Sequence, residues 1–79
     1  MHPDSYADSR ALGADLRRAD YPEWADKIDD VITAGFTSGE ILMGLRRTLR
    51  QIRDTERGLP QDLGERVQAL YRAIDAVLL

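Results

Sequence analysis

Residues 36–57, with the sequence FTSGEILMGLRRTLRQIRDTER, decide the fold of this chain. Thr37 and Glu40 have the Thr-x-x-Glu spacing of a capping box, which marks the start of a helix, and Phe36 and Ile41 are placed to close a hydrophobic staple. Apolar residues then recur at helical spacing, and they are Ile41, Leu42, Leu45, Leu49 and Ile52. The sequence therefore predicts an amphipathic helix of about 20 residues that ends near Arg57, before the Gly-Leu-Pro run at 58–60.

Two further helices are predicted on either side of this segment. Downstream, a broad apolar stripe between about Gln61 and Val77 consists of Leu63, Val67, Leu70, Tyr71, Ile74, Val77 and Leu78. Upstream, Pro22 suits the first turn of a helix because its missing N–H would have no partner there, and Asp20 and Glu23 are spaced to cap that helix. The apolar face of this upstream helix is Trp24, Ile28, Val31 and Ile32. We expect it to end at Gly35 in a left-handed conformation.

The N-terminal part of the chain predicts a fourth, weaker helix. It lies between Tyr6 and Ala19, its stripe is narrow, and Gly13 weakens its interior. No segment alternates apolar and polar residues as a strand would, and helices joined by short turns pack as antiparallel neighbours. We therefore predict an all-α fold, a small up-and-down bundle of four helices, three long and one weaker at the N-terminus. Because 79 residues build one core, residues 1–79 are predicted to form a single domain with residues 1–6 frayed.

Composition favours a folded, cytoplasmic protein. Hydrophobic residues make up 43% of the chain and charged residues 32%, which is typical of a globular domain. The absence of cysteine excludes disulfides and favours a reducing compartment, and no run is long and apolar enough to suggest a membrane partner. The net charge of −3 argues weakly against a general nucleic-acid binder. The acids are concentrated in residues 1–36, which hold eight of them against four bases.

We find no pattern that predicts catalysis or a cofactor. The single histidine, His2, lies at the end of the chain, where a general base would not be held in place. Four carboxylates, Glu23, Asp26, Asp29 and Asp30, share the outer face of the second predicted helix. They lack the spacing of a calcium-binding loop, and a charged outer face is the ordinary state of a surface helix. We therefore expect no enzyme activity, no cofactor and no metal site.

The sharpest surface feature is a row of arginines on the 37–57 helix. The row follows the spacing i, i+4, i+7, i+11, and it consists of Arg46, Arg50, Arg53 and Arg57, with Arg47 beside it. Arginine forms paired hydrogen bonds with carboxylates and phosphates, so the row is a candidate surface for an acidic protein or a nucleic-acid backbone. No aromatic residue stands between the arginines to stack on bases, which disfavours nucleic acid. The alternative is that the arginines solvate the helix and pair with Asp54, Glu56 or the acidic second helix.

Met43 is a further candidate contact residue. On a helical wheel it falls among Arg47 and Arg50, where an adaptable apolar side chain suits a binding surface. The alternative is that Met43 and Leu42 touch the first helix. The acidic face of the second helix offers a mirror hypothesis, in which its carboxylates imitate a row of phosphates and block a basic site on another protein.

Two stretches, Tyr21-Pro22-Glu23-Trp24-Ala25-Asp26-Lys27-Ile28 and Gly39-Glu40-Ile41-Leu42-Met43-Gly44-Leu45-Arg46, resemble a group of short bacterial all-helical proteins with no assigned activity. The resemblance extends over roughly residues 12–78. It implies a bacterial, cytosolic, helical protein and no particular site. In style the chain also resembles the small acidic immunity proteins that neutralise bacterial toxins.

These observations lead to one main hypothesis and one alternative. The main hypothesis is a non-catalytic protein–protein interaction module, of an immunity-like or regulatory kind, that uses the outer faces of the second and third helices. Self-association is included, because an apolar end at 77–79 seldom stays uncovered. The alternative is a nucleic-acid-binding protein that uses the arginine row.

Overall fold

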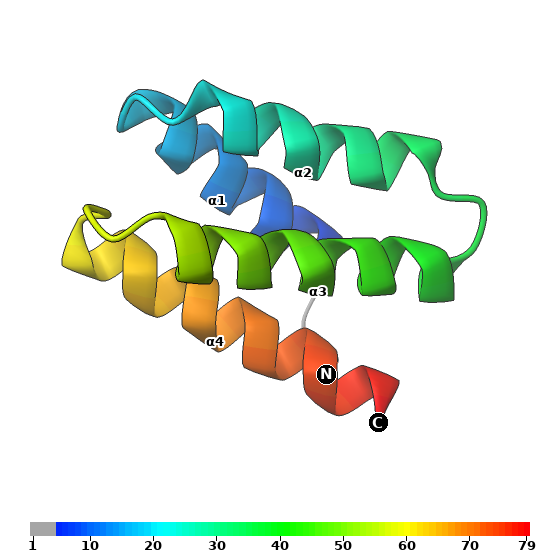
Figure 1. The fold of residues 1–79 in the computed structure, drawn as a ribbon. Helices are drawn as coiled ribbons and strands as arrows, with labels where there is room; N and C mark the ends of the chain where they lie inside the picture. Colours follow the sequence, from blue (N-terminus) through cyan, green and yellow to red (C-terminus); the bar gives the residue numbers. More distant parts are fainter. Residues whose placement is uncertain (1–4) are drawn as a thin grey trace.

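The computed structural model describes residues 5–79, which fold into four antiparallel helices (Figure 1). They are α1 (Ser5–Arg18), α2 (Pro22–Ala34), α3 (Ser38–Thr55) and α4 (Gln61–Leu78). Each helix packs against the next one along the chain, and α1 also packs against α4, so the four helices close into a ring around one core. The described part of the chain contains no strand. The predicted all-α bundle of four helices is therefore confirmed.

The core consists of the apolar stripes that the helical spacing predicts. Its fully or nearly fully buried members are Leu12, Leu16, Ile28, Ile32, Leu45, Leu49, Ile52, Leu63, Val67, Leu70 and Ile74. Seven residues of the predicted stripes are not fully buried. Val77, in the last turn of α4, is 64% exposed, and six are only partly buried at the edge of the core: Trp24, Val31, Ile41, Leu42, Tyr71 and Leu78.

The N-terminal helix is better formed than its narrow stripe predicts. α1 has 14 residues, one more than the 13 of α2, and it begins at Ser5. Tyr6 packs against the core, so the frayed segment expected at 1–6 does not include Ser5 and Tyr6; residues 1–4 lie outside the described part. Gly13, expected to weaken the helix interior, is buried against Ala25 of α2, where a Cβ would make only ordinary van der Waals contact.

The prediction that Asp20 caps the start of α2 is wrong. Asp20 does not begin α2; it ends α1 in the left-handed conformation, with φ = 74°, the only positive φ among the described non-glycine residues. The Tyr21 N–H donates to Leu16 O at 2.8 Å and the Asp20 N–H to Arg17 O at 3.2 Å. These two bonds form a Schellman motif, which satisfies the last carbonyls of the helix. α2 then begins at Pro22 without a side-chain cap.

The turn between α2 and α3 contains the predicted Thr37 cap with a reciprocal bond to Glu40 from the residue before the N-cap, but it lacks the predicted staple. Thr37 Oγ1 accepts a bond from the Glu40 N–H at 3.1 Å, and the Glu40 carboxylate accepts one from the Phe36 N–H at 3.2 Å. Phe36 itself is 94% exposed, so it does not close a staple. Ile41 packs against Gly35 instead, at a place where any Cβ on Gly35 would overlap Ile41 Cγ1. Gly35 has φ = −74°, so close approach and not a left-handed turn requires glycine there.

A second glycine fixes the position of α3 on α2. A Cβ on Gly44 would lie 2.6 Å from Val31 Cγ1, well inside van der Waals contact. The backbones of α2 and α3 therefore approach closely where Gly44 meets Val31. In the sequence, Gly44 lies between Met43 and the arginine row.

Candidate functional site

The structure divides the predicted arginine row into tethered and free members. Arg46 turns toward α4, where its Nη1 lies 2.9 Å from Asp75 Oδ1. Arg53 also lies on the α4 side: its guanidinium is 5.0 Å from the centre of the Tyr71 ring, and its Nε bonds to Asp54 at 3.1 Å. These two arginines are held by the protein itself. Part of the expected intramolecular pairing therefore exists, but its main partners are on α4.

Arg47 and Arg50 are the free members of the row. Both side chains are exposed, and neither side chain makes a hydrogen bond or ion pair within residues 5–79. Together with Arg46 and Met43 they line a shallow hollow of about 160 Å³ on the outer side of α3. We call these four residues the α3 arginine surface. Because Arg47 and Arg50 have no side-chain partner within residues 5–79, an incoming carboxylate or phosphate replaces only water at these two side chains.

Met43 belongs to this surface. Its residue is 48% exposed, and it lines the same hollow as the three arginines. Leu42, which the alternative placed beside Met43 against the first helix, packs against the core. The surface therefore combines strong positive charge with one flexible apolar side chain, a composition that is enriched in protein interfaces.

Arg57 and Glu56 lie outside the α3 arginine surface. α3 ends at Thr55, two residues earlier than expected, with Glu56 as its C-cap, so Arg57 follows the helix instead of continuing its outer face. The Glu56 carboxylate accepts a hydrogen bond from Trp24 Nε1 at 2.9 Å. It therefore anchors the end of α3 to α2 and does not pair with an arginine of the row.

The acidic face of α2 is exposed, and α1 neutralises part of it. Arg17 Nη2 lies 2.8 Å from Asp26 and 4.0 Å from Asp29, and the hydrogen bond to Asp26 is the main cause that raises the pKa of Arg17 above its ordinary value. Glu23 and Asp30 are exposed and have no ion pair within residues 5–79. In the same part of the chain, no ion pair joins α2 to α3. The two charged faces, therefore, do not pair with each other within one molecule.

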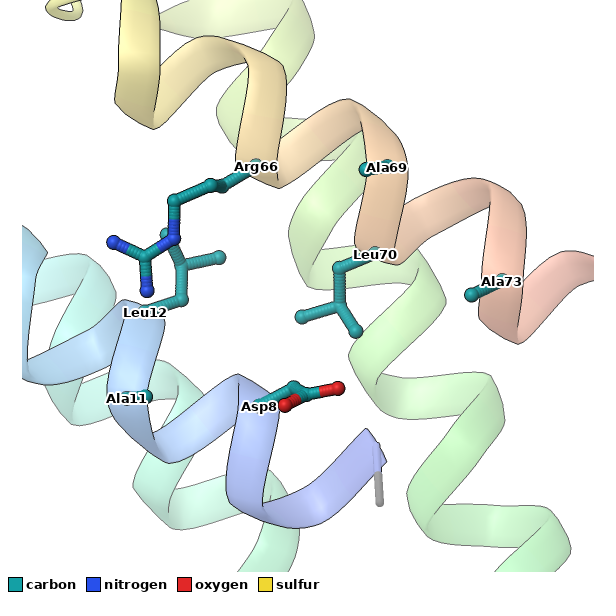
Figure 2. A pocket seen from close by; sticks show the side chains of 7 residues that line it. All are labelled: Asp8, Ala11, Leu12, Arg66, Ala69, Leu70 and Ala73. Atoms are coloured by element: carbon teal, nitrogen blue, oxygen red, sulfur yellow. The ribbon is translucent and has the colours of Figure 1, made fainter. Parts of the chain in front are cut away.

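A hollow of about 250 Å³ lies between α1 and α4 (Figure 2). Its walls are apolar and small, and they consist of Ala11, Leu12, Ala69, Leu70 and Ala73, with Asp8 and Arg66 as the polar residues. Figure 2 shows the Arg66 side chain extending from α4 across the gap toward α1. Arg66 bonds to Asp15, and this hydrogen bond is the main cause that lowers the pKa of Asp15. None of the described residues that line this hollow is a serine, threonine, cysteine or lysine nucleophile.

A third hollow, of about 230 Å³, lies beside the α2–α3 contact. It is lined by Glu23, Trp24, Lys27 and Glu56, and Lys27 Nζ is 5.1 Å from the centre of the Trp24 ring. The lysine therefore already covers the aromatic face by a cation–π contact.

The described residues also show no arrangement suited to a metal. Among residues 5–79, no three histidine, aspartate or glutamate side chains come together in a way that would hold an ion. His2 lies outside the described residues. None of the described helices is long and apolar enough to cross a bilayer.

Sequence reasoning missed two residues that shape the site, Asp75 and Tyr71. They lie one helical turn apart on the side of α4 that meets α3, and they hold Arg46 and Arg53, respectively. The sequence contains a signal for the Asp75 contact. An aspartate that borders the apolar stripe of one helix can pair with an arginine at the same place on an antiparallel neighbour. Using it requires the register of α3 against α4, which the spacing within one helix does not contain.

Comparison of the chain with protein families, with characterised proteins and with solved structures gave no match. The resemblance to short bacterial helical proteins therefore stays a prediction.

Proposed function

We propose that this protein is a non-catalytic interaction module that binds a protein partner through the α3 arginine surface. The observation that carries the proposal is the pair Arg47 and Arg50, which are exposed and unpaired beside the half-exposed Met43. Arginine and adaptable apolar side chains supply much of the binding energy at protein interfaces, and a carboxylate on the partner would complete the arginine hydrogen bonds. We further propose a cytoplasmic setting, which the absence of cysteine supports.

Two features favour an acidic protein over a nucleic acid. The α3 arginine surface contains no aromatic side chain on which a base could stack. The acidic face of α2 lies next to it, and an extended polyphosphate backbone would be repelled over about a Debye length of 8 Å. A compact acidic segment of a protein can contact α3 without passing over α2.

Affinity capture with matched variants tests this proposal. The test variant is Arg47→Glu/Arg50→Glu. The control is Arg10→Glu/Arg72→Glu, which changes the net charge equally at two arginines that are exposed and unpaired within residues 5–79, on α1 and α4. We expect the wild type and the control to retain the same protein from a native lysate and the test variant to lose it.

Two results would contradict the proposal. Equal retention by all three proteins would show that α3 is not the binding surface. The nucleic-acid alternative would be favoured if the wild type retains nucleic acid without nuclease and the captured material is lost after nuclease treatment.

A further inference from the structure

The outer faces of α2 and α3 are adjacent and opposite in charge, and they do not pair with each other within residues 5–79. Asp26 and Asp30 lie one turn apart on the exposed side of α2, and Arg47 and Arg50 lie on the exposed side of α3. The ion pairs between helices in residues 5–79 join α1 to α2, α1 to α4 and α3 to α4, and none joins α2 to α3. Each molecule therefore presents a negative and a positive strip side by side, and neither neutralises the other.

The two strips are also in register along the bundle. α2 and α3 are antiparallel neighbours (Figure 1). Lys27 Nζ lies 3.5 Å from Gln51 Oε1 at one level, and Val31 meets Gly44 nearer the other end. Counted along the two antiparallel helices from these contacts, Asp30 is about level with Arg47, and Asp26, one residue before Lys27, is about level with Arg50. The acids and the arginines therefore occupy the same two heights of the bundle.

We propose that the chain forms a two-fold symmetric homodimer in which α2 of each copy lies on α3 of the other. The two-fold axis runs parallel to the helices and lies outside the bundle, facing the groove between α2 and α3. Rotation about it places each α2 over the second copy's α3. Rotation about such an axis does not change heights along the bundle. Asp30 therefore faces Arg47 of the second copy, and Asp26 faces Arg50. The arrangement is closed, because both complementary strips of each copy are used, so it forms dimers and not filaments.

The local contacts suit this arrangement. Asp30 has no competing ion pair within residues 5–79, and Asp26 bonds to Arg17 through Oδ1, which leaves Oδ2 for a second arginine. Met43 adds an apolar contact at the rim of the same surface. Because the carboxylates and arginines are exposed before association, they lose hydration when they pair, so the dimer is expected to be weak and sensitive to salt.

The dimer does not rest on the proposed function. It covers the α3 arginine surface, so an acidic segment of another protein would compete with the second copy. A protein that stays monomeric and still captures its partner through Arg47 and Arg50 contradicts the dimer alone. A protein that dimerises as described and captures nothing contradicts the proposed function alone.

Sedimentation equilibrium with charge-reversed variants tests the dimer. The acidic variant is Arg47→Glu/Arg50→Glu, the basic variant is Asp26→Lys/Asp30→Lys, and the control is Arg10→Glu/Arg72→Glu. Circular dichroism checks that each variant is folded. The wild type and the control are expected to approach twice the monomer mass of 8.9 kDa at low salt and to return to the monomer in about 1 M salt, where the Debye length is about 3 Å.

The mixing experiment gives the decisive result. Alone, each charge-reversed variant has like charges at both contacts and is expected to be monomeric. Mixed in equal amounts, the two variants regain opposite charges at both contacts, and they are expected to form a heterodimer of about twice the monomer mass at low salt. A monomeric wild type at low salt and high concentration overturns the proposal. So does a wild-type dimer that the acidic variant leaves intact, or a mixture that stays monomeric.

Discussion

Substitution of Gly44 by alanine tests the close approach of α2 and α3. In a helix interior, replacing glycine by alanine usually stabilises a protein by about 1 kcal/mol, because glycine has more backbone entropy to lose. At Gly44 the new Cβ would lie 2.6 Å from Val31 Cγ1, about 1 Å inside normal contact. Val31 cannot easily turn away, since a β-branched side chain in a helix has one strongly preferred rotamer.

The expected change is the sum of these two effects. Overpacking of this kind costs about 1–3 kcal/mol. Set against the helix-propensity gain, it makes Gly44→Ala destabilising by about 1 kcal/mol, with a melting temperature lower by about 4–8 °C. Gly64→Ala is the matched control, because nothing lies within 4 Å of its Cβ position in α4. That control is expected to stabilise by about 0.5–1 kcal/mol.

Urea unfolding followed by circular dichroism measures both free energies. The double variant Gly44→Ala/Val31→Ala removes the Cγ atoms that cause the overlap. Its loss of stability is therefore expected to be smaller than the sum of the two single losses, by at least about 0.5 kcal/mol. If Gly44→Ala stabilises the protein as much as Gly64→Ala does, the α2–α3 crossing described here is incorrect. The position of the α3 arginine surface relative to α2 would then also be in doubt.

Three further predictions concern the ends and the interior of α1. Asp20→Gly is expected to stabilise the fold by about 1 kcal/mol in urea unfolding, because it removes a left-handed aspartate and a negative charge from the C-terminal end of a helix; an unchanged midpoint would contradict the Schellman geometry. Ser9→Ala is expected to stabilise by about 1 kcal/mol, since Ser9 Oγ is buried with no hydrogen-bond partner, and a loss of stability would show that the hydroxyl is bonded in solution. The hydrogen bond from Arg66 lowers the pKa of Asp15 below its ordinary value of 3.8, so the stability that this pair contributes is present at pH values above 3.8 and is lost as the pH falls through the lower folded-state pKa. The difference in unfolding free energy between wild type and Asp15→Asn should therefore be constant above about pH 5 and shrink toward pH 2; a difference that does not change with pH would contradict it.

The helix ends show how far local signals carry. Thr37 and Glu40 identify the start of α3 correctly, because a capping box is formed by neighbours in the chain. The predicted roles of Asp20 as an N-cap and of Gly35 as a left-handed helix end are wrong. An aspartate is acceptable both as an N-cap and in the left-handed conformation, and a glycine is acceptable both at a left-handed end and under a neighbouring side chain. Only the packing of Tyr21 against the core and of Ile41 against Gly35 selects between these roles.

The candidate site follows the same division. Helical spacing places Met43 among Arg47 and Arg50, and the structure confirms this placement, since all three border one hollow. Spacing could not separate these free arginines from Arg46 and Arg53, which α4 holds through Asp75 and Tyr71.

The amino-acid sequence by itself determined four amphipathic helices, the apolar stripes that form their core and the charged faces opposite those stripes. These features repeat with the 3.6-residue period of a single helix, so each segment contains them independently of the others. The tertiary structure alone decided which charges are neutralised and which stay free. That outcome depends on the rotation and register of one helix against another, and these are set by the fit of side chains between helices, which the spacing within one helix does not contain.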